Sequence, residues 1–189
     1  MRTGLTLLLI AHSFQTAAQP GRAAQAAAGA RAAVVAAGRL GIREATGKND
    51  GPAIDAMLRL VGSPRFSPWC GAEQAWQQQL CGLPFPRQAG GARFWAVDPV
   101  RTYFVRGTRG SVDSLKPGHQ VMFYYANLGR IGHIGRAVAP GRSVRRGRPA
   151  RGWWCVEGNT GTSGTREGAG VHRLFRQANE FYACTNYLY

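Results

Sequence analysis

The sequence predicts a single α+β domain in which N-terminal helices pack on a small antiparallel β-sheet. A chain of 189 residues can bury a proper core, and a hydrophobic fraction of 44% with five tryptophans argues against disorder. Ten prolines and 26 glycines indicate many turns and short elements, which disfavours a helical bundle. Helical spacing of apolar residues precedes the turn Lys116-Pro117-Gly118, and strand patterns follow it.

The first 40 residues predict a leader and an alanine-rich segment. A basic start, a short apolar run over residues 5–11 and small residues up to position 19 are typical of a secretory signal peptide. The run is far shorter than the roughly 20 residues that cross a bilayer. We therefore expect residues 1–19 to be a signal peptide and the protein to be secreted or periplasmic. Residues 20–40 form a helix or a linker, and residues 41–189 form the domain.

Two amphipathic helices are predicted in the first half of the domain. The turn at residues 49–52 starts a helix over about 52–61, which has an apolar stripe. A second helix runs from about 68 to 80, with Ser67 suited to cap it and Pro68 suited to its first turn. The side of this helix expected to face the core carries Trp69, Ala72, Trp76 and Leu80, and its polar residues are Gln74, Gln77 and Gln78. Residues 84–110 are expected to be a turn-rich connection with a short helix near 91–96.

Strands are expected in the second half. The predicted strands cover residues 121–126, 132–139, 152–158, 171–175 and 180–187. The segment 128–130 forms the hairpin between the first two, and residues 140–151 are expected to be an arginine-rich loop.

The net charge of +15 is concentrated in one part of the chain. Seven arginines lie within residues 130–151, and no acidic residue lies between Asp113 and Glu157. Such a stretch attracts polyanions, which include nucleic acid, anionic lipid and the anionic polymers of a bacterial envelope. The alternative is a solvated basic loop without a partner. No nucleic-acid-binding motif is present, so we do not expect nucleic acid as the partner.

Four residues predict nucleophilic chemistry. Cys70 lies at a predicted helix start, where backbone N–H groups and the helix dipole favour a thiolate and should lower its pKa. His133 lies on a glycine-rich strand with little to shield it, and the next strand places Glu157 and Asn159 on one face. If these strands are neighbours, Glu157 or Asn159 can hold one imidazole nitrogen of His133 while the other meets the Cys70 sulfur. This is the nucleophile–base–orienter arrangement of a cysteine hydrolase.

Each of these residues also has a simpler interpretation. A cysteine on an amphipathic helix can be a small buried hydrophobe, a strand histidine can make a local hydrogen bond, and Glu157 can lie at the surface. The other cysteines, Cys81, Cys155 and Cys184, form no CxxC motif, so no zinc or redox site is predicted. If Cys70 stays free, at most one disulfide can form, and the pair cannot be chosen from the sequence.

Five short segments resemble the CHAP-domain peptidoglycan hydrolases, a papain-like branch of the NlpC/P60 group. The segments are residues 41–51, 68–70, 116–121, 129–135 and 156–160, and they occur in the order seen in that family. The resemblance covers roughly residues 41–175. Two departures stand out: Gly71-Ala72-Glu73-Gln74 is more polar than the family's run after the cysteine, and His119 replaces an acidic residue.

The resemblance implies a papain-like fold and an amide-cleaving activity on bacterial peptidoglycan. It implies Cys70 as nucleophile, His133 as base, Glu157 as the orienting residue and Asn159 as its support, with Trp69 beside the nucleophile as a substrate contact. The acidic cluster that binds calcium in some phage relatives is missing, so neither a metal nor another cofactor is expected.

Two functions of different classes follow. The first is an exported, monomeric cysteine hydrolase, either an endopeptidase or an N-acetylmuramoyl-L-alanine amidase, held on an anionic envelope by the arginine-rich residues 130–151. The second is a non-catalytic domain of the same fold that binds the cell envelope or another polyanion.

Overall fold

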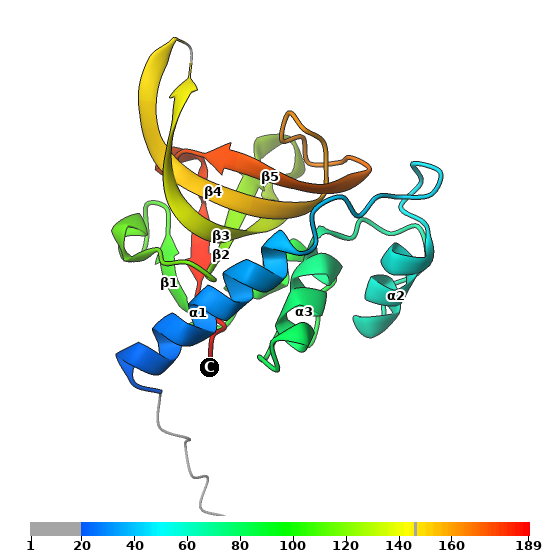
Figure 1. Cartoon of the computed structure of the whole chain (residues 1–189), viewed down its shortest axis with the longest axis horizontal. Helices are drawn as coiled ribbons and strands as arrows, with labels where there is room; N and C mark the ends of the chain where they lie inside the picture. The colour runs from blue at the N-terminus through cyan, green and yellow to red at the C-terminus, as the bar shows by residue number, and fades with distance from the viewer. Residues whose placement is uncertain (1–19, 146) are drawn as a thin grey trace, which may run out of the picture.

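A computed structural model describes residues 20–189 except residue 146, and these residues form a mixed α+β structure (Figure 1). The predicted signal peptide, residues 1–19, lies outside the described residues. In the described part of the chain, no helix has both the length and the apolar character needed to cross a bilayer.

Three α-helices precede the sheet in the described chain, as the sequence predicts. They are α1 (Arg22–Ala37), α2 (Pro52–Leu60) and α3 (Cys70–Leu80). Four short 3-10 helices lie between later elements: η1 (Ala92–Ala96), η2 (Val112–Ser114), η3 (Ala126–Leu128) and η4 (Ala178–Glu180).

Six strands form one antiparallel sheet in the order β1-β6-β2-β3-β4-β5. Their bounds are β1 (Thr102–Val105), β2 (Gln120–Tyr125), β3 (Arg130–Arg145), β4 (Arg148–Thr160), β5 (Gly170–Arg176) and β6 (Ala183–Thr185). The short strand β1 lies inside the segment expected to be a turn-rich connection.

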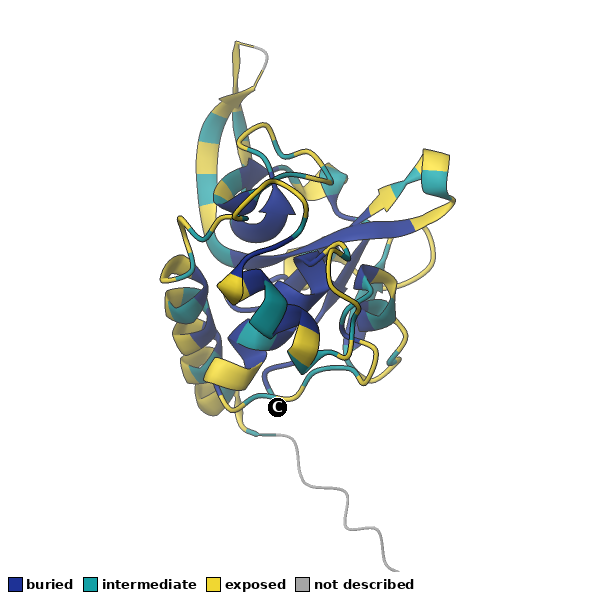
Figure 2. Ribbon diagram, turned by 90° about the vertical axis from the view of Figure 1, so that its right-hand side faces the viewer, coloured by how far each residue is buried: buried dark blue, intermediate teal, exposed yellow. Residues whose placement is uncertain are grey.

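The predicted arginine-rich loop at residues 140–151 is wrong. Strands β3 and β4 keep pairing from Arg136 with Val156 out to Arg145 with Arg148, so this segment is a long two-stranded hairpin. Figure 1 shows it rising away from the helices, and Figure 2 shows its outer end exposed. The glycines, proline and arginines of this segment are typical of a loop, but backbone pairing between β3 and β4 holds it in an extended conformation.

The sheet buries residues on both faces, as β2 illustrates. Met122 packs in a cluster that includes residues of α3 and η1, whereas Val121 and Phe123 pack in a separate cluster with Phe181. Alternate residues of a strand point to opposite faces, so two cores share this one sheet.

The core side predicted for α3 is confirmed at Trp69 and Ala72, which are fully buried, but it is wrong at Leu80 and at the glutamines. Leu80 is 55% exposed, whereas Gln77 and Gln78 are fully buried. The cause is the buried Arg136 of β3, whose guanidinium donates to Gln77 Oε1 and Gln78 Oε1 at 2.7 Å each and to the carbonyl of Gly118 at 2.7 Å. A buried guanidinium needs acceptors on every side, so the polar side of α3 turns inward.

Helix α1 is part of the domain and not a linker. Gly29 of α1 lies so close to the turn before β2 that an added Cβ would be 2.4 Å from the carbonyl oxygen of Pro117. On the other side of this contact Gly118 has φ +90°, and its own Cβ would be 2.6 Å from Gly29 Cα. The two glycines therefore let helix and turn touch through their backbones.

We predict that Gly29→Ala lowers the free energy of unfolding by about 1–3 kcal/mol, because the new methyl group meets a backbone carbonyl that cannot move aside. Helix propensity alone would favour alanine over glycine by about 1 kcal/mol. Urea denaturation measures the change, with the exposed Ala27→Gly as the control for propensity. An increase in stability in Gly29→Ala would contradict this backbone contact.

Candidate active site

Cys70 is the first residue of α3, as the sequence predicts, but the helix start is held differently from expectation. Ser67 does not cap the helix, which begins at Cys70 with Trp69 as the preceding residue. The backbone N–H of Trp69 donates to Asn159 Oδ1 at 3.0 Å, and this bond fixes the chain directly before the thiol. Asn159 lies on β4, so the sheet itself positions the nucleophile candidate.

A partly buried polar cluster fixes Trp69 and Asn159 in turn. Glu44 accepts the Trp69 indole N–H at 2.8 Å and the backbone N–H of Asn49 at 2.9 Å. Asn159 donates to the side-chain oxygen of Asn49 at 2.9 Å and to the carbonyl of Gly168 at 3.2 Å. Segment 42–50 is thereby attached to the start of α3.

Two of the predicted roles change as a result. Trp69 is 0% exposed, and its indole N–H donates to Glu44, so it has no free surface for the predicted substrate contact. It anchors the start of the helix instead. Asn159 does not support His133 as expected; its carboxamide binds Trp69 and Asn49. It positions Cys70 instead of the base.

His133 and Glu157 meet as predicted. His133 Nε2 lies 2.9 Å from Glu157 Oε2, and both side chains are fully buried on neighbouring strands. This leaves Nδ1 as the nitrogen for Cys70. Nδ1 has no partner of regular hydrogen-bond geometry, but the Cys70 side chain interacts strongly enough with the imidazole to raise its pKa.

The glycines beside His133 have a different role from the one expected. They do not open the imidazole to solvent, because His133 is 0% exposed. Gly135 instead makes room for the carboxylate: a Cβ at this position would lie 2.5 Å from Glu157 Cγ. A larger residue there would displace Glu157 from His133.

Arg176 completes the site, and the sequence did not single it out. Its Nε donates to Glu157 Oε1 and its Nη2 to Glu157 Oε2, at 2.7 Å each, which is the bidentate geometry of a strong ion pair. The guanidinium also lies 4.7 Å from the ring centroid of Phe123, whose ring is 5.7 Å from that of His133. Arg176 therefore holds the carboxylate that holds the base.

These contacts shift the pKa values of His133 and Glu157 in opposite directions. Burial disfavours the charged form of His133, but Cys70 and Glu157 outweigh it and raise its pKa to about 9. Burial also disfavours the Glu157 anion, but Arg176 and then His133 outweigh it and lower the pKa of the carboxyl group. At neutral pH the site holds an imidazolium against Cys70 and a carboxylate behind it.

Tyr125 is a second residue that the sequence did not reveal. Burial raises the pKa of its hydroxyl, Arg176 opposes this change, and Glu157 and Cys70 add to it. The half-buried phenol therefore lies within electrostatic reach of the thiol and the carboxylate.

The remaining cysteines and His119 lie outside this arrangement. All four cysteines are free and buried. Burial raises the pKa of Cys155 well above its usual value and that of Cys184 to about 12, which disfavours their thiolates. His119 lies 2.9 Å from the Tyr103 hydroxyl through Nδ1, and burial together with Lys116 and Arg136 lowers its pKa to about 4. Among the described residues, no group of three acidic, histidine or cysteine side chains gathers closely enough to hold a metal ion.

Comparisons with known proteins do not identify a relative: no protein-family model, no curated protein and no solved structure matches this chain.

We predict that Arg176→Met lowers the free energy of unfolding by about 3–5 kcal/mol, because Glu157 then stays buried without its cation. Adding Glu157→Gln should recover part of the loss, since the amide removes the unpaired charge. Thermal or urea unfolding of the single and double variants measures both effects. The ion pair would be unimportant if the double variant were no more stable than Arg176→Met.

The raised pKa of His133 predicts a pH dependence of stability. The pKa is about 9 in the folded protein against 6.5 ordinarily, so the stabilisation is complete below pH 6.5 and is lost as the pH rises through 9. We expect the free energy of unfolding to fall by on the order of 1–3 kcal/mol between these values. His133→Gln should lack this component, and parallel curves for the two proteins would contradict it.

Proposed function

We propose that this protein is an exported cysteine hydrolase of papain-like fold that cleaves an amide bond of bacterial peptidoglycan. The observation that carries the proposal is the buried series of contacts from Arg176 through Glu157 and His133 to Cys70. A histidine held by a carboxylate and placed beside a cysteine at a helix start is the base–nucleophile arrangement of a cysteine hydrolase. A buried histidine that served only to fill space would not need a carboxylate partner that is itself paired with an arginine.

The chemistry assigned to each residue follows from its position. The Cys70 thiolate attacks the carbonyl carbon of the amide, and the backbone N–H of Cys70 is available to the developing oxyanion. The His133 imidazolium gives its proton to the leaving nitrogen as the C–N bond breaks, which leaves a thioester. The neutral His133 then takes a proton from water, whose oxygen attacks the thioester and releases the carboxylic acid and Cys70. Glu157 keeps the imidazole in orientation, and Arg176 is a positioning residue behind it.

The substrate class comes from the sequence resemblance to CHAP-domain hydrolases and from the predicted signal peptide. Peptidoglycan offers amide bonds in its stem peptides, in its crossbridges and between muramic acid and L-alanine, and it lies where a secreted or periplasmic enzyme would meet it. No cofactor takes part in this chemistry.

A second candidate function is supported by the basic hairpin of β3 and β4. Its exposed arginines fit a non-catalytic domain that binds the cell envelope or another polyanion. In that case the thiol–imidazole pair would contribute to stability alone.

We predict that the wild-type protein releases soluble fragments from purified sacculi and that Cys70→Ala and His133→Ala release none, because nucleophile and base are both required. Mass spectrometry of the products identifies the bond. Cys81→Ala is the matched control, since this buried free cysteine packs in a separate cluster with Ala32 and Leu188. Absence of fragments from the wild type, or equal release by the Cys70 variant, would refute the hydrolase and leave the binding domain.

A further inference from the structure

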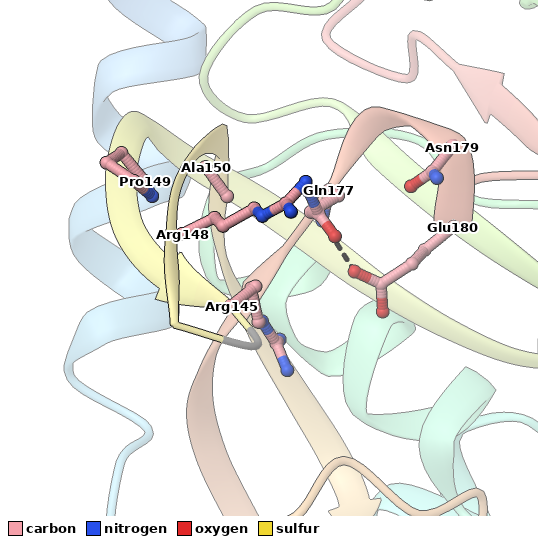
Figure 3. Close-up of a pocket in the computed structure, with 7 residues that line it drawn as sticks. All are labelled: Arg145, Arg148, Pro149, Ala150, Gln177, Asn179 and Glu180. Atoms are coloured by element: carbon pink, nitrogen blue, oxygen red, sulfur yellow. Dashed lines mark hydrogen bonds between the residues drawn. The ribbon is translucent and has the colours of Figure 1, made fainter.

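Two adjoining cavities lie along the β3–β4 hairpin. The larger, of about 840 Å³, lies between the hairpin and residues 177–180, and Figure 3 shows the residues that line it. The smaller, of about 270 Å³, lies between Arg145, β5 and the loop at residues 162–164. Arg145 lines both, so the cavities meet at this residue. We call the surface formed by the two cavities the arginine groove; its charged and aromatic lining residues are Arg145, Arg148, Trp154, Arg173, Phe175, Arg176 and Glu180.

Aromatic rings hold two of the guanidinium groups in place. Arg173 lies over the Trp154 ring at 4.6 Å, and Arg145 lies 5.7 Å from the Phe175 ring centroid while donating to the Phe175 carbonyl. Stacking leaves guanidinium edges available for hydrogen bonds to an oxyanion. The groove is therefore organised before any ligand arrives.

The positive charge of the groove is not neutralised within the protein. The Arg148 side chain makes no ion pair or hydrogen bond with the described residues, and Figure 3 shows it extending toward Gln177. Glu180 is the acidic lining residue, and its two oxygens already accept from Arg176 Nη1 at 3.3 Å and from the Gln177 backbone at 2.6 Å. Unpaired cations around a cavity favour an anionic ligand.

We propose that the arginine groove binds a linear polyanion that lacks bases, with phosphate or carboxylate groups engaging Arg145, Arg148 and Arg173. A chain of anions fits the two cavities better than a single small ion, because the guanidinium groups are distributed over both. Thr162 and Ser163 add hydroxyl donors at the smaller cavity. The inference does not depend on the proposed hydrolase activity.

The aromatic residues argue against nucleic acid as the ligand. Base stacking needs exposed aromatic faces. Here the Trp154 face carries Arg173, the Phe175 ring is approached by Arg145, and the two rings pack edge to face at 5.5 Å. The groove offers guanidinium groups to a backbone but no platform to a base.

The test measures binding of fluorescently labelled inorganic polyphosphate by anisotropy at low salt. Arg145→Gln/Arg148→Gln should weaken binding at least about tenfold, since two charge-assisted hydrogen-bonding groups are lost. The matched control is Arg59→Gln/Arg87→Gln, which removes the same charge from exposed positions outside the groove and should change affinity by less than about threefold. Arg148→Gln/Arg173→Gln repeats the test without breaking the Arg145 bond to the Phe175 carbonyl.

The competing ligands distinguish the remaining outcomes. Polygalacturonate competing as well as unlabelled polyphosphate would identify a carboxylate ligand within the proposal, and its failure to compete would identify phosphate. Equal losses in groove and control variants, or no binding of either polyanion, would overturn the proposal. So would an oligodeoxythymidine of matched charge that binds as tightly through the same arginines. None of these probes contains a peptidoglycan amide, so the result is separate from hydrolysis.

Discussion

The buried ion pair between Glu157 and Arg176 is the interaction on which the rest of the site depends. A carboxylate in the interior is costly unless it is fully paired, and Glu157 is paired on both oxygens by one guanidinium and on one of them by His133. Strand β4 lies between β3 and β5, so it places Glu157 between the base and the cation. A shift of either neighbouring strand would leave a buried charge unpaired.

The same strand also connects the base to the thiol. Two residues beyond Glu157, Asn159 binds the backbone ahead of Cys70, and Glu44 secures both Asn159 and Trp69. A single strand thus sets the positions of the imidazole and of the helix start. The arginine groove extends to Arg176, which lines its smaller cavity. The groove and the candidate active site therefore share Arg176, the positioning residue behind Glu157.

Local patterns were enough to predict part of this arrangement. The helix start at Cys70, the strand carrying His133 and its pairing with the strand of Glu157 follow from turn residues and alternation in the sequence. Arg176 could not be predicted, because several arginines could reach a buried carboxylate and only the packing of β5 selects one. The burial of the α3 glutamines could not be predicted for a similar reason: their side-chain oxygens accept hydrogen bonds from Arg136, which lies some 60 positions away in the sequence. The hairpin was mistaken for a loop because its composition resembles one, whereas strand pairing over long distance determines it.

The most direct test of the central claim is a pH titration of His133 by NMR with labelled histidine, assigned with His133→Gln. The charge balance of Arg176, Glu157 and Cys70 predicts that the imidazole stays protonated at pH 7 and titrates with a pKa of about 9. A His133 that is neutral at pH 7, or that titrates at or below its ordinary value of 6.5, would contradict the account.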